Sequence, residues 1–236
     1  MSIIIVTGGS GRFGLTLKKF KTKQKIFFPT KKQLDILSEK KIQNYISKRK
    51  PKFLIHLAGL SRPMNIHKKN IHKSINLNII GTANVVKACA KKNIKLIYFS
   101  TNYVYQGNKG NYEETDPLLP VNNYAWSKLG GETSVQLYKN SLILRLSMTE
   151  KPFVHKKAFS NVKTNFMFHE DLVKILPKLI DQKGVINVGG KSQSVYSFAK
   201  FHNKTIKKIK AKKNNSMPLN QTMNLTKLKK VIKNSK

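Results

Sequence analysis

A phenol and an amine stand four residues apart in the segment Tyr124-Ala125-Trp126-Ser127-Lys128. In a helix, this spacing puts Tyr124 and Lys128 on one face. A nearby ammonium group lowers the pKa of a tyrosine, so that the phenol can exchange a proton close to neutral pH. The pair therefore predicts acid–base chemistry at Tyr124.

A glycine-rich turn follows the first apolar run of the chain, residues 3–6. Gly8, Gly11 and Gly14 have the spacing of a dinucleotide-binding turn, in which glycines permit a tight bend and close approach of the backbone to a pyrophosphate. The helix that follows would present its amino terminus to the phosphates. Because the turn lies between an expected strand and an expected helix, we expect it to bind a dinucleotide, with an ordinary glycine-rich turn as the alternative.

Two hydroxyl side chains follow a later apolar run, residues 95–99. Either Ser100 or Thr101 can donate a hydrogen bond to the carbonyl oxygen of a substrate. With Tyr124 and Lys128, one of them would complete a proton-transfer set beside a nicotinamide ring.

The residues after the second expected strand bear on the choice of dinucleotide. NAD enzymes usually place Asp or Glu there to bind the ribose 2′-hydroxyl, whereas this chain has Pro29-Thr30-Lys31-Lys32. Lys31 or Lys32, together with Arg12, can neutralise a 2′-phosphate. We therefore expect NADPH as the cofactor, with NADH as the alternative.

These groups require a scaffold in which strands and helices alternate. The pattern predicts a doubly wound parallel α/β sheet, the NAD(P)-binding Rossmann fold, whose loops after the strands meet at one rim. The expected strands are 3–6, 25–28, 52–57, 95–99, 141–146 and 185–188, and the expected helices are 11–20, 38–49, about 70–92, 123–138, 170–181 and 195–208.

The alternation loosens after residue 147. We expect residues 1–147 to form the dinucleotide-binding domain, with 170–190 packing back onto it, and residues 148–236 to form a small, abbreviated substrate-binding part with a basic tail. Residues 147–168 indicate a partly irregular excursion. The final stretch of the chain, rich in Lys and Asn, is expected to pack loosely.

Several segments resemble those of one enzyme family. They are TGGSGRFG (7–14), LDI (34–36), KPKFLIHLAG (50–59), NIIGTAN (78–84), STNYVYQGNKGNYEETDPLLPVNNYAWSKLGGE (100–132), LILRLS (142–147), the region 169–190 and MNLTKLKKV (223–231). The chain resembles an extended short-chain dehydrogenase/reductase and, more narrowly, the RmlD-like dTDP-4-dehydrorhamnose reductase family of sugar-nucleotide-binding proteins. The segment 100–132 is the most specific part of this resemblance.

The resemblance implies NAD(P)H-dependent reduction of a 4-keto group on a nucleotide-linked deoxysugar. It implies that Thr101 polarises the carbonyl, that Tyr124 donates the proton, and that Lys128 binds the nicotinamide ribose and tunes Tyr124. The residues that it places at the cofactor are Gly8, Gly11, Arg12, Phe13, Gly14, Asp35, Ile36, Ala58, Gly59, Tyr124 and Lys128.

Other reactions of the wider superfamily are weighed against this one. A 4,6-dehydratase carries Asp-Glu immediately after the Thr, where this chain has Asn102 and Tyr103, which counts against that reaction. The reductase family itself often has Asp at the position of Asn102, and we expect activity to survive the change. A sugar-nucleotide 4-epimerase stays open. A non-catalytic NADP-binding regulatory subunit is the non-enzyme alternative, and the intact set Thr101, Tyr124 and Lys128 argues against it.

The composition is strongly basic, with 46 Lys and Arg against 10 Asp and Glu and a formal net charge of +36. The four Arg residues are outnumbered by Lys, which is spread along the chain, whereas base recognition favours Arg. We therefore expect a solvated Lys-rich surface without a specific nucleic-acid partner. The expected partners are a nucleotide-sugar substrate and, as one option, a second copy of the chain in a homodimer.

The remaining features bound the compartment and the metal content. One cysteine, Cys89, excludes an internal disulfide and a multi-cysteine metal site, and the histidines lack metal-ligand spacing, so no metal is expected. The start MSIIIVTGG lacks the features of a secretory signal, and no apolar run is long enough to span a membrane. We expect a cytoplasmic protein.

Four further residues have a functional and a structural interpretation. Arg145 ends an expected strand at the ligand rim, where it would either face a substrate diphosphate or form a structural salt bridge. We expect His56 to be structural, Cys89 to be a small core residue, and Trp126 to pack beside the pocket rather than stack on a base.

Overall fold

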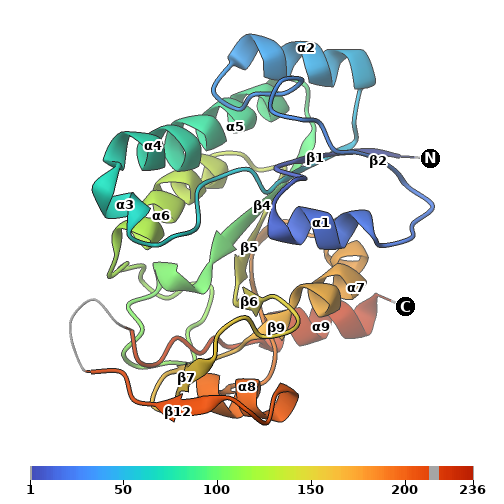
Figure 1. The fold of residues 1–236 in the computed structure, drawn as a ribbon. Coiled ribbons are helices and arrows are strands. Elements are labelled where there is room, and N and C mark those ends of the chain that lie inside the picture. The colour runs from blue at the N-terminus through green and yellow to red at the C-terminus, as the bar shows by residue number, and fades with distance from the viewer. Residues whose placement is uncertain (1, 213–217, 236) are drawn as a thin grey trace. The chain divides into compact units, whose positions relative to one another are not determined.

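A computed structural model of the chain describes residues 2–212 and 218–235. Strands and helices alternate along the chain, as Figure 1 shows. The strands are β1 (Ile3–Thr7), β2 (Lys25–Phe27), β3 (Phe53–His56), β4 (Lys95–Thr101), β5 (Ser141–Leu146), β6 (Met148–Thr149), β7 (Lys157–Phe159), β8 (Lys163–Thr164), β9 (Met167–Phe168), β10 (Gly184–Val188), β11 (Gln193–Ser194) and β12 (Lys207–Ile209). The helices are α1 (Arg12–Lys18), α2 (Glu39–Arg49), α3 (Ile66–Lys69), α4 (Ile71–Ile75), α5 (Gly81–Lys91), α6 (Asn123–Gln136), α7 (His169–Leu179), α8 (Val195–His202) and α9 (Thr226–Asn234), with a π-helical segment at Asn76–Ile80 and a 3-10 turn at Asn102–Val104.

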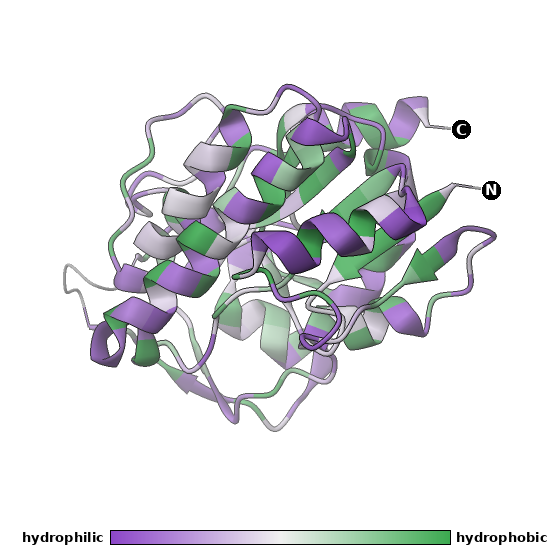
Figure 2. Cartoon of the chain, turned by 90° about the horizontal axis from the view of Figure 1, so that it is seen from above, coloured by the Kyte–Doolittle hydropathy of each residue, from purple (hydrophilic) through white to green (hydrophobic). Residues whose placement is uncertain are grey.

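The central sheet has six strands in the order β10-β5-β4-β3-β1-β2, and β1 pairs in parallel with both β2 and β3. Ile5, Leu54 and Leu96 are fully enclosed, because strands of a parallel sheet are covered on both faces. Figure 2 shows these strands in the green of hydrophobic residues. The predicted doubly wound α/β fold is confirmed. The strand order changes direction at β1, so that a ligand crevice is expected at the carboxyl ends of β1 and β3.

The residues group by their contacts into two compact units. The first unit comprises Met1–Ser100, Trp126–Leu144 and Gln182–Gly184, and the second comprises Thr101–Ala125, Arg145–Asp181 and Val185–Lys236. The domain boundary expected at residue 147 stays a prediction. Within the expected substrate-binding part, residues 213–217 and 236 lie outside the described residues.

In the first unit, the helical stretch expected over about 70–92 is confirmed, although it is not one regular α-helix. The chain forms α4, then the π-helical segment, then α5. Asn78 lies in the π-helical segment, and its side chain accepts from Leu60 N at 2.6 Å and donates to Leu60 O at 2.9 Å. The wider turn therefore coincides with an amide that binds the backbone of another loop, as π-bulges often do at functional positions.

In the second unit, the core is largely aromatic. Phe153, Phe168 and Phe198 pack with Ala158 and Ile206, and the rings of Phe168 and Phe198 lie 5.0 Å apart. Residues 147–168 contain the short strands β6 to β9 with irregular chain between them, so the expected partly irregular excursion is confirmed.

The helix expected over 195–208 ends early, at His202. Asn203 Oδ1 accepts from Thr205 N at 2.9 Å, which turns the chain out of the helix. Lys207–Ile209 then forms β12, which pairs in parallel with β7. A side-chain turn and a strand partner far away in sequence therefore replace the last part of this prediction.

The expectation of loose packing near the carboxyl terminus is wrong for residues 218–235. Met223 and Leu228 are only 3% and 4% exposed, and α9 covers half of this stretch. Tyr112 and Met223 form a parallel β-bridge. The abundance of Lys concealed a helical spacing of apolar residues at 225, 228 and 232.

Candidate active site

The glycine turn lies between β1 and α1 in the first unit. Gly8 has a φ of +70°, and a Cβ atom there would lie 2.5 Å from the backbone nitrogen of Ala58. Gly11 N donates to Gly8 O at 2.9 Å, which closes the turn. A Cβ atom on Gly14 would lie 2.7 Å from the Cα atom of Gly9. Glycine is therefore required at Gly8 and Gly14, and the turn contacts the loop after β3 at the expected crevice.

The outer side of the turn is open at Gly11. This residue is exposed, and a Cβ atom on it would meet only the Gly8 carbonyl oxygen, at 3.2 Å. No side chain caps the amino terminus of α1, and the amino terminus of a helix favours an anion. Arg12 donates to Ser61 Oγ at 3.0 Å, whereas the Phe13 ring lies 4.9 Å from Phe99 within the core. A role for Phe13 at the cofactor stays a prediction.

The other residues expected at the cofactor lie after β2 and β3. Asp35 Oδ1 accepts from Leu37 N at 3.0 Å, and Lys31 Nζ lies 4.0 Å from the Asp35 carboxylate. Ile36 is buried and contacts Gly81 so closely that a Cβ atom there would lie 2.6 Å from Ile36 Cδ1. The Ile36 side chain therefore belongs to the core, and contacts of Asp35 and Ile36 with an adenine stay predictions.

A chain of hydrogen bonds connects the loop after β3 to the π-helical segment. Ala58 N donates to Thr7 Oγ1 at 3.3 Å, and Thr7 Oγ1 and Thr82 Oγ1 lie 2.7 and 3.1 Å from the two ring nitrogens of His56. Thr82 in turn donates to Asn78 O at 2.8 Å. Since the Thr82 hydroxyl hydrogen is used there, His56 Nε2 donates to Thr82 Oγ1. Burial lowers the pKa of His56 to about 3, so the ring is neutral near pH 7 and its Nδ1 accepts from Thr7. The structural role expected for His56 is confirmed.

Asn78 is a site residue that the sequence reasoning missed. Its side chain is fully buried and donates to Ser127 Oγ at 2.8 Å, in addition to its two bonds to Leu60. A Cβ atom on Gly59 would lie 2.8 Å from Asn78 Oδ1. Asn78 therefore joins the loop after β3 to α6, next to Lys128. An Asn inside an amphipathic helix pattern gives no signal of this role.

Lys128 projects from α6 onto an aromatic ring. Its Nζ atom lies 4.1 Å from the centroid of Tyr98, whose hydroxyl donates to Lys128 O at 3.0 Å. The Lys128 side chain as a whole is half-buried. Burial lowers the pKa of Lys128 to about 7, and the carboxylate of Glu132 opposes this change. Such a lysine can titrate in the range where it would control a proton transfer.

Ser100 and Glu132 form a buried pair in the same unit. The Ser100 hydroxyl donates to Glu132 Oε2, and the two residues are 5% and 0% exposed. Of the two hydroxyls that the sequence offered for a substrate carbonyl, Ser100 is therefore engaged elsewhere. Glu132 was not singled out from the sequence, although it extends the spacing of Tyr124 and Lys128 by a further turn.

Thr101 and Tyr124 belong to the second unit. Thr101, the last residue of β4, is buried, and its Oγ1 atom accepts from Tyr103 N at 3.3 Å. The rings of Tyr103 and Tyr124 meet edge to face, with centroids 6.3 Å apart. Tyr124 and Lys128 both lie in α6, which confirms the expected helix. That Thr101, Tyr124 and Lys128 meet around one substrate stays a prediction.

Arg145 is a structural residue of the second unit. It is 2% exposed, and its Nη1 atom donates to Tyr105 Oη at 2.8 Å and to Glu114 O at 2.9 Å. Tyr105 Oη also donates to Asn187 Oδ1 at 2.8 Å. Arg145 therefore holds the long loop after β4, and the alternative of a substrate diphosphate is wrong because the guanidinium group is buried in this network.

Two other expectations differ in outcome. Cys89 is fully buried, and burial raises the pKa of its thiol, so the expected core role is confirmed. Trp126 is 49% exposed, and the packing of its ring beside the pocket stays a prediction. Its position between buried Ala125 and buried Ser127 turns it outward on α6.

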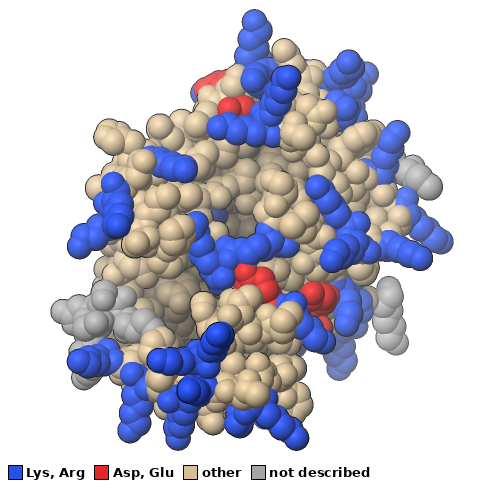
Figure 3. All heavy atoms as spheres, viewed as in Figure 1, with Lys and Arg blue, Asp and Glu red and all other residues tan. Residues whose placement is uncertain are grey.

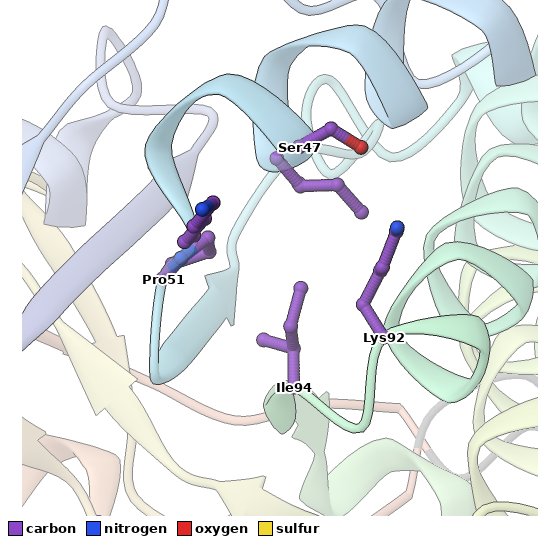
Figure 4. A pocket seen from close by; sticks show the side chains of 6 residues that line it. Ser47, Pro51, Lys92 and Ile94 are labelled. Atoms are coloured by element: carbon purple, nitrogen blue, oxygen red, sulfur yellow. The ribbon is translucent and has the colours of Figure 1, made fainter.

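A pocket of about 380 Å³ lies elsewhere in the first unit, and Figure 4 shows its lining residues. Pro51 and Ile94 precede β3 and β4, so the pocket is at the amino ends of these strands. Lys50 and Lys92 cap the carboxyl termini of α2 and α5, where cations are stabilised by the helix dipoles. The glycine turn lies at the opposite ends of the strands, so this pocket is separate from it.

In the described part of the chain, neither the surface charge, nor the helices, nor the metal-binding types of side chain mark a further site. Figure 3 shows Lys and Arg side chains on many separate parts of the visible face. Within residues 2–212 and 218–235, no helix is both long and apolar enough to cross a membrane. Over the same residues, no group of three or more His, Cys, Asp or Glu side chains is arranged to hold a metal ion.

The sequence matches a family and several characterised proteins. A family model described as the RmlD substrate binding domain matches residues 1–177. A dTDP-4-dehydrorhamnose reductase from Aggregatibacter actinomycetemcomitans is 28% identical over 154 residues, which cover 63% of this chain and 52% of that protein. A methionine adenosyltransferase 2 subunit beta from Danio rerio is 29% identical over 144 residues, which cover 56% of this chain and 43% of that protein. The chain spans about half the length of these curated relatives.

Solved structures share the fold. A dTDP-4-dehydrorhamnose reductase from Bacillus anthracis, solved in complex with NADP, superimposes with a TM-score of 0.86. The superposition covers 97% of this chain and 91% of that chain at 24% sequence identity.

Proposed function

The chain belongs to the RmlD substrate binding domain family, and we propose that it is an NAD(P)H-dependent reductase of a 4-keto group on a nucleotide-linked deoxysugar. The observation that carries the proposal is the combination of a glycine turn at the switch point of the sheet with a half-buried lysine of lowered pKa, Lys128, one helical turn after a tyrosine. The reductase from A. actinomycetemcomitans supports the class of reaction.

The glycine turn fits a dinucleotide, because it is open at Gly11 and the amino terminus of α1 carries no side-chain cap. Gly8, Gly11 and Gly14 would hold the pyrophosphate, and Lys128 would bind the nicotinamide ribose. Arg12, the first residue of α1, and Lys31 and Lys32, after β2, would supply cations for a 2′-phosphate. The NADP in the B. anthracis structure is consistent with NADPH as the preferred cofactor, with NADH as the alternative.

The bound cofactor would supply a hydride from C4 of its nicotinamide to the keto carbon. The hydroxyl of Thr101 would donate a hydrogen bond to the keto oxygen, and the phenol of Tyr124 would give that oxygen its proton as negative charge develops. The reduction would leave the substrate as an alcohol, the nicotinamide oxidised and Tyr124 as a phenolate. The ammonium group of Lys128 would stabilise the phenolate until solvent returns the proton.

The test is a panel of 4-keto nucleotide sugars incubated with NADPH, with oxidation followed by the absorbance of the reduced nicotinamide. We expect at least one substrate to be reduced stoichiometrically to the 4-hydroxy sugar. Interconversion of 4-epimers without net consumption of NADPH would replace the reductase by an epimerase.

A second function is favoured by one specific match. The D. rerio relative is named as a subunit of methionine adenosyltransferase, and it covers more than half of this chain. A non-catalytic NADP-binding regulatory subunit would bind NADPH tightly but reduce no member of the panel. That combination of results would decide for this second function.

A further inference from the structure

Helix α6 lies against Tyr98 and the π-helical segment so closely that its inward face is fixed. A Cβ atom on Gly131 would lie 2.3 Å from Asn78 O and 2.8 Å from Tyr98 Oη. Glycine is needed here because of this contact, and any larger residue would rotate or displace the helix. The contact determines which side chains of α6, among them Lys128 and Glu132, face the interior of the first unit.

Glu132 places a carboxylate in this interior. It is fully buried, and the hydroxyl of Ser100, at the end of β4, donates a hydrogen bond to it. A buried carboxylate is costly unless it is both hydrogen-bonded and balanced by a cation. Ser100 provides the hydrogen bond, and the spacing of one helical turn directs Glu132 toward the side chain of Lys128.

The other groups around the Lys128 ammonium cannot balance its charge. The Tyr98 ring under Nζ attracts a cation but carries no net charge. His56 stacks on Tyr98 with centroids 5.9 Å apart, and burial lowers the pKa of His56 to about 3, so the ring carries no charge near pH 7. Among the described groups that act on Lys128 from α6, β3 and β4, Glu132 is therefore the one that favours the ammonium form.

We propose that Glu132, held in place by Ser100, is a positioning residue that keeps Lys128 protonated for the proposed reduction. This inference rests on the proposed function for its purpose, although the interaction itself can be measured without substrate. The two neighbouring hydroxyls then have separate roles. Ser100 holds the carboxylate of Glu132 that acts on Lys128, and Thr101 is left to bind the substrate. Tyr124, Lys128 and Glu132 then also form one series along α6, in which each group sets the protonation of the preceding one.

The electrostatics agree with this geometry. Burial lowers the pKa of Lys128 to about 7, and Glu132 acts in the opposite direction. Without the carboxylate, burial would act unopposed, and the amine would be neutral at pH 7. A neutral amine no longer lowers the pKa of a neighbouring phenol.

The experiment is an NMR titration of the side-chain nitrogen of Lys128 in ¹⁵N-lysine-labelled full-length protein. The resonance is assigned by its loss in Lys128→Met, and its low pKa separates it from the exposed lysines. We expect Glu132→Gln to reduce the proton affinity of Lys128 at least tenfold, which lowers the pKa measured in the titration by about one unit or more. Glu132→Asp keeps the charge on a shorter side chain and should fall between wild type and Glu132→Gln.

The matched control is Glu39→Gln, which removes one negative charge from an exposed residue of the same unit that pairs with Lys87. It should leave the Lys128 titration unchanged. An unchanged titration in Glu132→Gln overturns the inference. If Glu132→Gln does not fold, an unchanged titration in Glu132→Asp has the same consequence. A shifted titration in a protein that reduces none of the panel would support the inference and reject the proposed reductase, so the two failures are distinguishable.

Discussion

His56 shows how a single buried residue makes stability depend on pH. Both of its ring nitrogens are committed to hydroxyl groups in a buried strand, and burial lowers its pKa from 6.5 to about 3. Between these two values the unfolded chain binds a proton at His56 that the folded chain does not. The free energy of unfolding must therefore fall as the pH falls from 6.5 toward 3.

We predict that His56→Gln reduces this pH dependence. The wild-type slope attributable to His56 is at most about 1.4 kcal/mol per pH unit, and a residue that does not titrate removes it. Urea unfolding at about pH 7 and about pH 5 measures the slope. The control is His72→Gln at an exposed position, which should keep the wild-type slope. Equal slopes for wild type and His56→Gln would show that the ring is protonated in the folded protein.

Thr101 carries the prediction for the substrate carbonyl. Thr101→Val preserves the shape of the side chain but removes its hydrogen bond, which should cost ~1–3 kcal/mol in kcat/KM. Thr133→Val, at an exposed position of α6, should leave kcat/KM unchanged. A fully active Thr101→Val protein would remove this residue from the mechanism.

At the residue scale, sequence reasoning recognised the reactive types but not their partners. Ser100 and Thr101 are adjacent hydroxyls at the same strand end. Their residue types alone left both open, and the hydrogen bond of Ser100 to Glu132 in the fold agrees with the family resemblance in leaving Thr101 for the substrate. Arg145 is a similar case, because its partners Tyr105 and Glu114 lie in a loop about which periodicity says nothing.

At the scale of elements, the glycine turn is the most predictable part of the protein. Its spacing, the preceding strand and the following helix are all local, and the structure has all three. The helical stretch expected over about 70–92 is present, but its middle is π-helical where Asn78 contacts a distant loop, which the local pattern did not predict. The helix expected over 195–208 ends early because of another distant contact. Residues 207–209 form β12, whose partner β7 is far away in sequence. Local patterns predict elements, whereas distant contacts decide where some of them break.

We predict that Gly11→Val abolishes the binding of both NADPH and NADH. The φ of Gly11 is −73°, which valine tolerates, so the variant should fold. Its side chain would project into the open side of the turn, where the pyrophosphate is expected. Calorimetric titration measures the affinity, with Leu15→Val on the exposed side of α1 as the control. Undiminished binding by Gly11→Val would place the pyrophosphate elsewhere, and a tenfold preference of the wild type for NADH would reverse the choice of NADPH.

At the scale of the whole chain, the charge of +36 is the most conspicuous property and says little about the reaction. The composition is dominated by Lys, and the visible face in Figure 3 carries cations in many places. Such a surface attracts polyanions through release of counterions without reading bases.

We predict weak binding to duplex DNA that is independent of sequence and is lost between low and physiological salt. Fluorescence anisotropy with two unrelated duplexes over a series of salt concentrations measures both properties. Binding that distinguishes the duplexes at physiological salt would mean that the basic surface has a specific nucleic-acid partner.

The account as a whole depends on Tyr124 acting as the proton donor of a keto reduction. The most direct test compares wild type and Tyr124→Phe for oxidation of NADPH by the best 4-keto nucleotide sugar, together with the affinity for NADPH. Removing a positioned general acid should lower kcat by ~10²–10⁴ and leave the affinity for NADPH nearly intact. The control Tyr138→Phe removes a hydroxyl that bonds the carbonyl of Ile94, and it should keep kcat. Near-normal turnover by Tyr124→Phe would contradict the mechanism.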